Sequence, residues 1–565
     1  MTELLTSAQM RDIEGRAIDS GAVTGLELME RAGRGVVDAV LSHWPQLLQQ
    51  RGPGAAGSSH AKDAGFFAGR RAVVLCGPGN NGGDGYVVAR LLHEMGWQVT
   101  VLGLGDPERL PPDARENCER WRRSGQVAAL TLDALRAATG GPRQADLLID
   151  ALFGTGATRP VTGAARAVLD HLGDAGAPSA PVVCIDAPSG MCLDSGRILG
   201  APGGYGAGRG FAALTVTFDS PKIGHMIGDG PRLCGALQVI DIGLEPWRTT
   251  GAPQSGEARP IRCKLVGPRL VADRRDTWQP ARVLGKRDHA AHKFDHGHCV
   301  VLSGGAARTG AARLAARAAL RAGAGLVTLA TPPDAVAEVA AQSTAVMVRE
   351  VPDAEALRRM LEDDRIVSVC LGPGLGVGAA TRDLVAAALE TDKRVVLDAD
   401  ALTAFAEAPA ALYDLVREDR VVLTPHGGEF KRLFPDVAER WTASEATSGP
   451  AFSKVDAARE AAALSRAVVL LKGADTVIAA AGGEAAVHAA VRDRSAPWLA
   501  TAGAGDVLSG IIAGLMARGI GAMQAAECGA WLHVEAALDF GPGMIAEDLP
   551  ECLPAVFRRL DDGDR

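Results

Sequence analysis

The feature that most constrains the fold is a buried strand running into a glycine-rich turn and then a helix, found in both halves of the chain. The apolar run Arg71–Cys76 is followed by the turn Gly77–Gly85 and by a helical pattern from Tyr86. In the second half, an apolar run ending at Ser303 leads into a glycine turn and an alanine-rich helix. Such a succession opens a βαβ unit, which predicts an α/β protein with parallel sheets.

Further apolar runs continue this alternation through the chain. They cover residues 98–104, 146–152, 181–186, 213–218 and 237–241 in the first half, and 326–330, 366–371, 394–397, 421–423 and 468–471 in the second. Residues 7–40 have a helical pattern, and the low-complexity stretch 51–65 is typical of a loop.

The length of 565 residues is too great for a single core. We predict two doubly wound, three-layer domains: a Rossmann-like domain at residues 1–245 and a second domain at 284–560. Residues 246–283, where Pro, Gly, Arg and Thr dominate a central stretch, are predicted to be the linker.

Composition excludes several classes of function. A net charge of −8 argues against general binding to nucleic acid or to a membrane surface. The N-terminus lacks a basic segment followed by an apolar one, so we expect a cytoplasmic protein without a signal peptide or membrane span. The 10 cysteines form no CxxC pair, which indicates reduced thiols and no zinc site. We also expect a homo-oligomer.

The stretch Ala500–Gly510 predicts a site for anions. Apolar residues after it, at Val507, Leu508 and Ile511, have the spacing of a buried helix face, so its glycines precede a helix N-terminus. Backbone N–H groups there favour an anion, and Asp506 could take a proton from a hydroxyl while a phosphoryl group is held. A tight turn with an Asp N-cap fits the same local pattern.

Polar side chains of the first half follow four different strands. Asn80, Asn81 and Asp84 follow the first, Asp150 with residues 154–160 follows another, and Asp186 and the loop holding Lys222 complete the set. Because ligands bind at the carboxyl ends of parallel strands, we expect these groups to form one site. The turn at residues 77–82 also matches GxGxxG, and Asp106 closes the next strand, so a Rossmann-type NAD site is an alternative.

Four motifs of the first half resemble the NAD(P)H-hydrate epimerase domain, over about residues 7–244. They are Leu28-Met-Glu-Arg-Ala-Gly33, Gly77-Pro-Gly-Asn-Asn-Gly-Gly-Asp-Gly85, Asp146-Leu-Leu-Ile-Asp-Ala-Leu-Phe-Gly-Thr-Gly156 and Asp186-Ala-Pro-Ser-Gly190. The resemblance implies that a hydrated nicotinamide nucleotide contacts Asn80, Asn81, Gly82, Gly83, Asp84, Gly154, Thr155, Gly156, Ala157, Thr158, Arg159, Pro160 and Asp186. It also implies a potassium site at Asn81, Asp150 and Ser189, whose oxygen ligands suit a hard cation. From the residues alone, Asp150 also fits an N-cap or a turn.

Six motifs of the second half resemble the ADP- or ATP-dependent NAD(P)H-hydrate dehydratase, a ribokinase-like fold, over about residues 288–545. They begin at Gly304, Gly372, Asp398, Thr424, Lys472 and Gly503. The resemblance implies a pocket for the hydrated coenzyme at Ala324, Gly374, His426 and Asp506, and a nucleotide site at Lys472, Gly473, Ala474, Asp475, Thr476 and Gly505. Trp498-Leu499 and the stretch after Ala341 depart from the expected pattern, and no GxxxxGK[ST] motif occurs.

These resemblances imply the repair of hydrated NADH and NADPH. Hydroxide is a poor leaving group and phosphate a good one, so a nucleotide, with ADP preferred to ATP, makes elimination feasible. Asp506 would be the base, and Asp186 and Lys222 would serve epimerisation, although Lys222 also fits a surface lysine and His426 a loop histidine. Glu429 and Asp400 are the candidates for positioning magnesium.

Two other classes of function fit part of the sequence. Ribokinase-like enzymes share the glycine-aspartate turn, so a small-metabolite kinase with a non-catalytic N-terminal domain is one alternative. A scaffold that binds nucleotides without turnover is the other.

Overall fold

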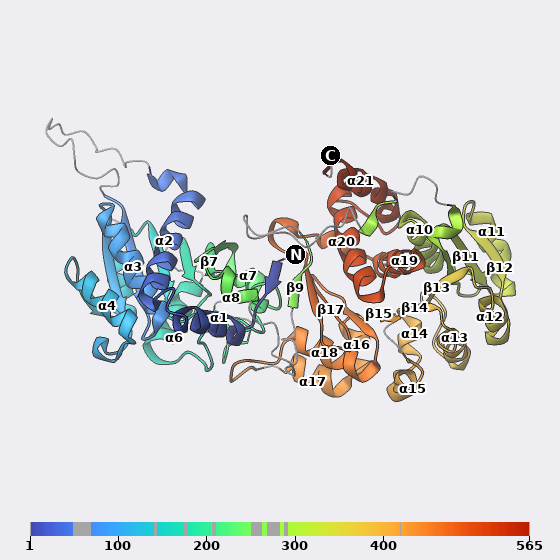
Figure 1. The fold of residues 1–565 in the computed structure, drawn as a ribbon, viewed down its shortest axis with the longest axis horizontal. Coiled ribbons are helices and arrows are strands. Elements are labelled where there is room, and N and C mark those ends of the chain that lie inside the picture. The colour runs from blue at the N-terminus through green and yellow to red at the C-terminus, as the bar shows by residue number, and fades with distance from the viewer. Residues whose placement is uncertain are drawn as a thin grey trace.

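The computed structural model describes residues 2–48, 69–140, 144–174, 179–202, 204–205, 211–249, 263–267, 283–286, 292–417, 420–443 and 445–563. The predicted loop at 51–65 and most of the predicted linker lie outside these residues. The described parts form two α/β units that lie side by side along the longest axis of the molecule (Figure 1).

The first unit contains a sheet of seven parallel strands in the order β4-β3-β2-β5-β6-β7-β8. Its strands are β2 (Arg71–Cys76), β3 (Gln98–Gly103), β4 (Val127–Ala129), β5 (Leu147–Ala151), β6 (Val182–Ile185), β7 (Leu214–Phe218) and β8 (Ala236–Ile240). The strand order reverses direction between β2 and β5, and ligands of such sheets bind at the carboxyl ends of the strands beside such a reversal. The turns predicted to bind substrate follow these two strands.

Helices cover both faces of this sheet. They are α1 (Ser7–Asp19), α2 (Gly25–His43), α3 (Asn80–Glu94), α4 (Pro112–Arg122), α5 (Leu132–Thr139), α6 (Gly163–Gly173), α7 (Gly230–Cys234) and α8 (Glu245–Thr249). Capping boxes at Thr6 and Thr24 fix where α1 and α2 begin. Because strand side chains alternate between faces, Val74 packs into one core and Val73 and Leu75 into the other.

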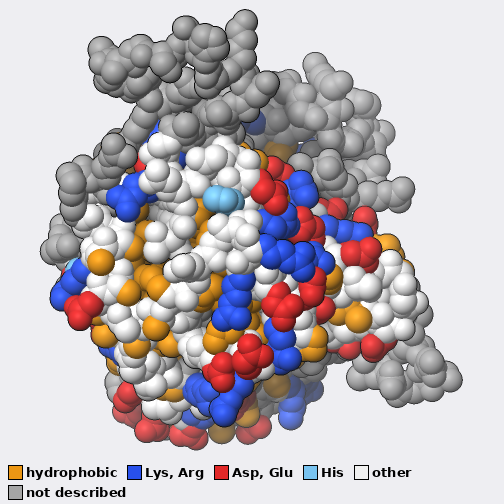
Figure 2. Space-filling model, turned by 90° about the vertical axis from the view of Figure 1, so that its left-hand side faces the viewer, with side chains coloured by type: hydrophobic (Ala, Val, Ile, Leu, Met, Phe, Trp, Pro, Cys, Tyr) orange, Lys and Arg blue, Asp and Glu red, His pale blue; other side chains and the backbone are white. Residues whose placement is uncertain are grey.

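On the end of the molecule formed by this unit, basic and acidic side chains lie next to one another (Figure 2).

The second unit contains an eleven-stranded sheet in the order β1-β9-β18-β17-β16-β15-β14-β13-β10-β11-β12. Its strands are β1 (Thr2–Leu4), β9 (Cys263–Leu265), β10 (His298–Leu302), β11 (Leu326–Thr331), β12 (Met347–Glu350), β13 (Ile366–Leu371), β14 (Arg394–Leu397), β15 (Val421–Leu423), β16 (Val468–Leu471), β17 (Asp475–Ala479) and β18 (Ala485–Ala489). The strands from β10 to β16 run parallel, and β17 and β18 form an antiparallel hairpin at the end of that series. Together the two sheets confirm the predicted doubly wound α/β fold.

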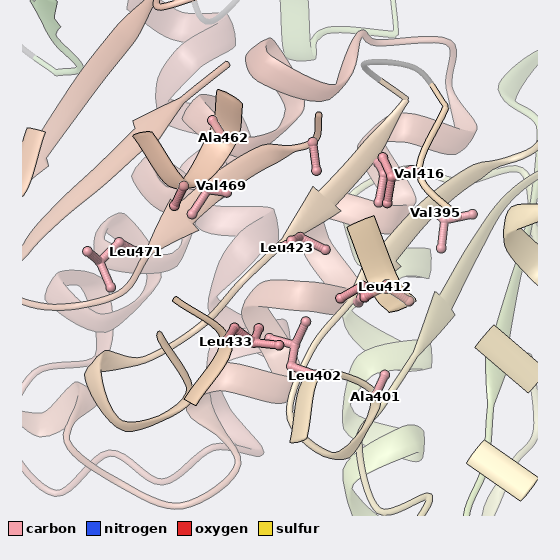
Figure 3. Close-up of a cluster of buried hydrophobic side chains, with 14 of the residues drawn as sticks. Val395, Ala401, Leu402, Leu412, Val416, Leu423, Leu433, Ala462, Val469 and Leu471 are labelled. Carbon is pink, nitrogen blue, oxygen red and sulfur yellow. The ribbon is translucent and has the colours of Figure 1, made fainter. Parts of the chain in front are cut away.

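Helices again lie on both faces of the second sheet. They are α10 (Gly310–Arg321), α11 (Val336–Gln342), α12 (Ala354–Leu361), α13 (Ala379–Leu389), α14 (Asp400–Thr403), α15 (Pro409–Tyr413), α16 (Gly427–Leu433), α17 (Pro435–Thr442), α18 (Lys454–Ser465), α19 (Ala504–Ala517), α20 (Ala522–Phe540) and α21 (Asp548–Gly563). Val395 and Leu423 pack with Leu402 and Leu433 on one face (Figure 3), and Val396 faces the core on the other. Among the described residues, no helix is long and apolar enough to cross a membrane.

Two short strands join the units at the edge of the larger sheet. β1, at the start of the chain, pairs antiparallel with β9, and β9 pairs with β18. The predicted boundaries assigned β1 to the first domain and β9 to the linker. In the structure both strands extend the larger sheet, because β9 pairs with the open edge of β18 and β1 pairs with β9.

A buried ion pair fixes β9 against the second unit. Lys264 Nζ lies 2.7 Å from Glu527 Oε1 and 2.9 Å from Glu484 Oε1. Burial raises the pKa of Glu527, and the Lys264 ammonium opposes this change. Glu527 is 1% exposed, so its charge depends on the lysine for compensation.

We predict that Lys264→Ala lowers the apparent thermal unfolding midpoint by about 5 °C or more, because it leaves a buried carboxylate without its cation. Glu484→Ala is the matched control, since it removes the exposed partner of the same lysine and should cost less than about 1 kcal/mol. Circular dichroism melting curves of the full chain measure both. Equal shifts of the unfolding midpoint for the two variants would contradict a stabilising role of the Lys264–Glu527 ion pair.

Candidate functional site

The first candidate site is built around Asp186, directly after β6. Its backbone has φ 65°, a left-handed conformation that is uncommon for non-glycine residues. One carboxylate oxygen accepts hydrogen bonds from the backbone N–H and the hydroxyl of Thr155, at 2.8 and 2.7 Å. The other accepts from Thr217 Oγ1 at 2.8 Å and from Lys222 Nζ at 3.0 Å. Asp186 is thus a buried carboxylate with fixed direction.

The surrounding groups favour the ionised form of Asp186. Burial raises its pKa, but the Lys222 ammonium, His225 and the hydroxyls of Thr155 and Thr217 together lower the pKa below the usual range. Lys222 is itself 1% exposed, so the alternative that it is a surface lysine is wrong. His225 Nε2 lies 2.8 Å from the carbonyl oxygen of Asp186, and burial, followed by the Lys222 charge, lowers the pKa of His225 to about 3.

The glycine turn after β2 faces the loop after β5. A Cβ placed on Gly154 would lie 2.8 Å from Asn81 Oδ1 and 3.0 Å from Asp186 Oδ2, so these three residues meet at one point. Asn81 Nδ2 is buried and has no hydrogen-bond partner within the described residues. Burial, then the charges of Asp186 and Glu14, raise the pKa of Asp84. The cluster therefore offers an amide donor beside two carboxyl groups.

The remaining predicted substrate residues lie along the same two turns. Asn80, Gly82 and Gly83 are in the first turn of α3, and Gly82 and Gly83 are buried there. Gly156, Thr158 and Arg159 are exposed, and Thr155, Ala157 and Pro160 are half-buried. The backbone of Thr158 accepts a hydrogen bond from Gly449 of the second unit, at 2.9 Å.

Asp150 and Ser189 form a second buried polar group next to this site. Ser189 Oγ donates to Asp150 Oδ1 at 2.6 Å, and the Ser189 N–H donates to Oδ2 at 2.9 Å. Burial raises the pKa of Asp150, and its hydrogen bonds with Ser189 oppose this change. No salt bridge to Asp150 occurs within the part of the chain that the structure describes. Its buried carboxylate and the Ser189 oxygen therefore suit a monovalent cation.

The second candidate site lies at the N-terminus of α19. Gly503 is the N-cap, with φ 90°, and Asp506 is in the first turn. Burial raises the pKa of Asp506 to about 6, with the Asp398 charge adding to the effect and Lys472 opposing it. A carboxylate that titrates near neutral pH at a helix N-terminus can accept a proton beside a bound anion.

Lys472 connects this turn to two neighbouring strand ends. Its Nζ donates to Asp398 Oδ1 at 2.8 Å and lies 3.9 Å from Glu429 Oε2. A Cβ on Gly505 would lie 3.4 Å from Lys472 Nζ and 4.0 Å from Asp398 Oδ2. The structure thus brings the predicted residues Lys472, Glu429, Gly505 and Asp506 together.

The other predicted nucleotide residues surround the start of β17. Gly473 and Ala474 are exposed, and Thr476 is buried and donates to the carbonyl of Gly473 at 2.8 Å. Asp475 Oδ1 lies 2.6 Å from Lys454 Nζ, and its Oδ2 accepts from the backbone N–H of Gly228 in the first unit, at 2.9 Å. The predicted nucleotide loop is therefore in direct contact with the segment that follows Lys222.

The candidates for magnesium have other partners in the structure. Asp400 Oδ2 accepts from the backbone N–H of Gly376 at 2.8 Å, which holds the loop containing Gly374. Glu429 accepts from the backbone N–H of His426 at 2.9 Å and completes the capping box of α16. Among the described residues, no group of three or more His, Cys, Asp or Glu side chains could hold a metal ion.

His426 and Ala324, both predicted to line the hydrate pocket, lie at opposite ends of their strands. His426 is exposed at the carboxyl end of β15, beside Glu429. Ala324 is buried in the turn between α10 and β11, at the amino end of that strand. Because the other predicted residues follow the carboxyl ends, the structure does not bring Ala324 to them.

The sequence-based prediction missed several polar residues of these sites. Asp398, which precedes the positive-φ residue Ala399, begins one of the dehydratase-like motifs, but the prediction assigned a role only to Asp400. Thr217 has no distinguishing signal, since it belongs to a buried strand. Glu14 lies in α1, far from Asp186 in sequence, and only the folded chain brings their charges close.

Two family models match separate parts of the chain. A family model described as YjeF-related protein N-terminus matches residues 25–224, and one described as NAD(P)H-hydrate dehydratase matches residues 299–553. A solved structure from Bacillus subtilis, titled ADP/ATP-dependent NAD(P)H-hydrate dehydratase co-crystallized with ATP/Mg²⁺, is 25% identical. It covers 50% of this chain and 96% of its own, with a TM-score of 0.41.

Two curated relatives cover the chain in different ways. The NAD(P)H-hydrate epimerase of Rhodobacter capsulatus is 46% identical, over 40% of this chain and 92% of its own. The bifunctional NAD(P)H-hydrate repair enzyme of Moorella thermoacetica is 36% identical, over 99% of this chain and 97% of its own. These findings confirm the resemblance of both halves, and the chain belongs to the family of bifunctional NAD(P)H-hydrate repair enzymes.

Proposed function

We propose that this enzyme returns hydrated NADH and NADPH to the active coenzymes by epimerising them at C6 and dehydrating the (6S) epimer. The observation that carries the proposal is the presence of two separate carboxylate sites, at Asp186 and Asp506, each beside a glycine turn. Hydration gives both epimers, and a dehydratase that accepts one of them needs the other to be converted. Two such sites in one chain make the mixture fully repairable.

In the dehydratase site, Asp506 takes the proton of the C6 hydroxyl while the hydroxyl oxygen attacks the terminal phosphoryl group of ADP. The N–H groups of Gly503 to Gly505 stabilise the transferring phosphoryl, an effect on the order of several kcal/mol. Phosphate then leaves C6 as a proton leaves C5, which forms the C5=C6 double bond of the reduced nicotinamide, and AMP is the second product. Lys472, held by Asp398, adds a positive charge beside this path. Residues Gly473 to Thr476 hold the nucleotide.

In the epimerase site, Asp186 is the base for the C6 hydroxyl. Lys222 keeps its carboxylate ionised, and Thr155 and Thr217 fix its direction. Asn81 and residues 154–160 bind the nicotinamide nucleotide. Opening and closing of the C6 centre then inverts its configuration.

The site after β5 would hold potassium through Asp150, Ser189 and Asn81. The support is the buried carboxylate of Asp150, which has hydrogen-bond donors but no ion pair among the described residues. Potassium would supply the missing positive charge and fix the loop that carries Gly154. The cytoplasmic location and the homo-oligomeric state stay predictions from the sequence.

Adding the enzyme with ADP to hydrated NADH should restore the absorbance of the reduced nicotinamide and consume both epimers. Asp506→Asn should reduce dehydration by at least about hundredfold while ADP still binds, because the amide keeps the size but cannot accept the proton. Absorbance kinetics and calorimetric titration with ADP measure the two effects.

Accumulation of a phosphorylated metabolite without restored absorbance would instead favour the kinase alternative. Near wild-type dehydration by the variant would remove Asp506 from its role.

Gly154→Ala should abolish epimerisation and leave dehydration of the (6S) epimer unchanged. The added methyl group would enter the space between Asn81 and Asp186. Gly15→Ala is the control in the same unit, because a Cβ there has no heavy atom within 4 Å and Gly15 lies outside both predicted substrate turns. Chromatography of both epimers over time distinguishes the variants, and similar epimerisation rates for the two would contradict the position of the substrate.

Exchange of potassium for a large organic cation in the buffer should slow epimerisation without slowing dehydration. The reason is that Asp150 belongs to β5, in the first unit, whereas the dehydratase site is built by the second. Unchanged epimerisation in potassium- and sodium-free buffer, with ion content checked by atomic emission, would speak against the cation site.

A further inference from the structure

Helix α1 is held across the epimerase site by contacts at two points. Leu5, just before the helix, donates its N–H to the carbonyl of Pro221 and accepts from the N–H of Ile223, both at 3.1 Å, and so lies beside Lys222. Arg11 Nη1 donates to the carbonyl oxygen of Thr155 at 2.8 Å. The first turns of α1 therefore lie between Lys222 and the predicted substrate loop.

Glu14 follows Arg11 by three residues, which places it on the same side of the helix. It is half-buried, and it forms no hydrogen bond or ion pair with any residue that the structure describes. The charged groups that face it are Lys222, Asp186, Asp219 and Arg11, and Asp84 responds to its charge. These groups belong to the turns after β2, β6 and β7 and to α1 itself. A carboxyl without a structural partner thus faces the acid–base residues of the site.

The charges around Glu14 suit proton exchange near neutral pH. Burial raises the pKa of Glu14 to about 7, with Asp186 and Asp219 adding to the rise and Lys222 and Arg11 opposing it. Asp186, by contrast, is held ionised by Lys222. The pKa of Glu14 is therefore raised and that of Asp186 lowered. This arrangement allows one carboxyl group to donate a proton while the other accepts one.

Inversion at C6 requires two proton transfers if the ring opens. Removal of the hydroxyl proton forms the C6 carbonyl, the C6–N1 bond breaks with its electron pair passing to N1, and N1 takes up a proton. Rotation of the open aldehyde and closure on the other face return both protons. Asp186 serves the hydroxyl in the proposed function, which leaves N1 in need of a donor.

Resting on that proposed function, we propose that Glu14 is the second acid–base residue of the epimerase, which gives a proton to the ring nitrogen during opening and takes it back during closure.

The test uses the full chain and follows both epimers chromatographically between about pH 6 and pH 8.5. Since Glu14 must be protonated for opening, the wild-type epimerisation rate should fall as the pH rises through about 7. Glu14→Gln should be at least about hundredfold slower and lack this fall, and Glu14→Asp should recover part of the rate and the pH dependence. Asp12→Asn is the control, because Asp12 is an exposed carboxylate of the same helix.

Dehydration of the (6S) epimer, measured on each variant, reports whether the chain is folded. A Glu14→Gln rate within about twofold of wild type would overturn the proposal, and so would a wild-type rate that does not fall with rising pH. If Glu14→Gln also loses dehydration, the Glu14→Asp and wild-type pH profiles decide. A wild type that leaves the two epimers unconverted would instead refute the proposed function itself.

Discussion

The structure of the first candidate site depends on the hydrogen bonds and the ion pair that the buried ammonium of Lys222 makes. Removing such an ion from water costs several kcal/mol, so it must be compensated by close partners. Asp186, Thr217 and the carbonyl of Phe218 provide them at 3.0, 2.7 and 3.1 Å. These partners follow or belong to two adjacent strands, and Leu5 borders the lysine on its other side. One charge thereby fixes two strand ends, the entry to α1 and the carboxylate proposed for catalysis.

The second half also contains a largely buried lysine, but there the carboxylates outnumber the ammonium group. Lys472 faces three carboxylates, from Asp398, Glu429 and Asp506, and cannot neutralise all of them. Asp398 lies closest to Lys472, at 2.8 Å. Burial first, and then the charge of Asp398, raise the pKa of Asp506. Burial together with an excess of acidic groups around one ammonium is thus a simple way to obtain a base at neutral pH without a histidine.

Much of this arrangement could be predicted from the sequence, because apolar runs and glycine turns are local signals. They located the parallel strands and the residues at their carboxyl ends, including Asp186, Lys222, Lys472 and Asp506. The pairing of β1 with β9 could not be predicted, since three-residue strands carry no periodicity. Glu14 was missed for a related reason: its surroundings come from residues that are distant in sequence.

The pairing of β1 also sets an order of events during synthesis. Its partner strand ends at Leu265, so the residues of β1 wait through about 260 further residues before they can pair. At ribosomal rates of about 5–20 residues per second this delay is roughly ten to fifty seconds. Leu5 adjoins both β1 and Lys222, so the beginning of the chain reaches its final place only when the edge of the other unit exists. The epimerase half therefore completes its folding only after part of the second half has been translated.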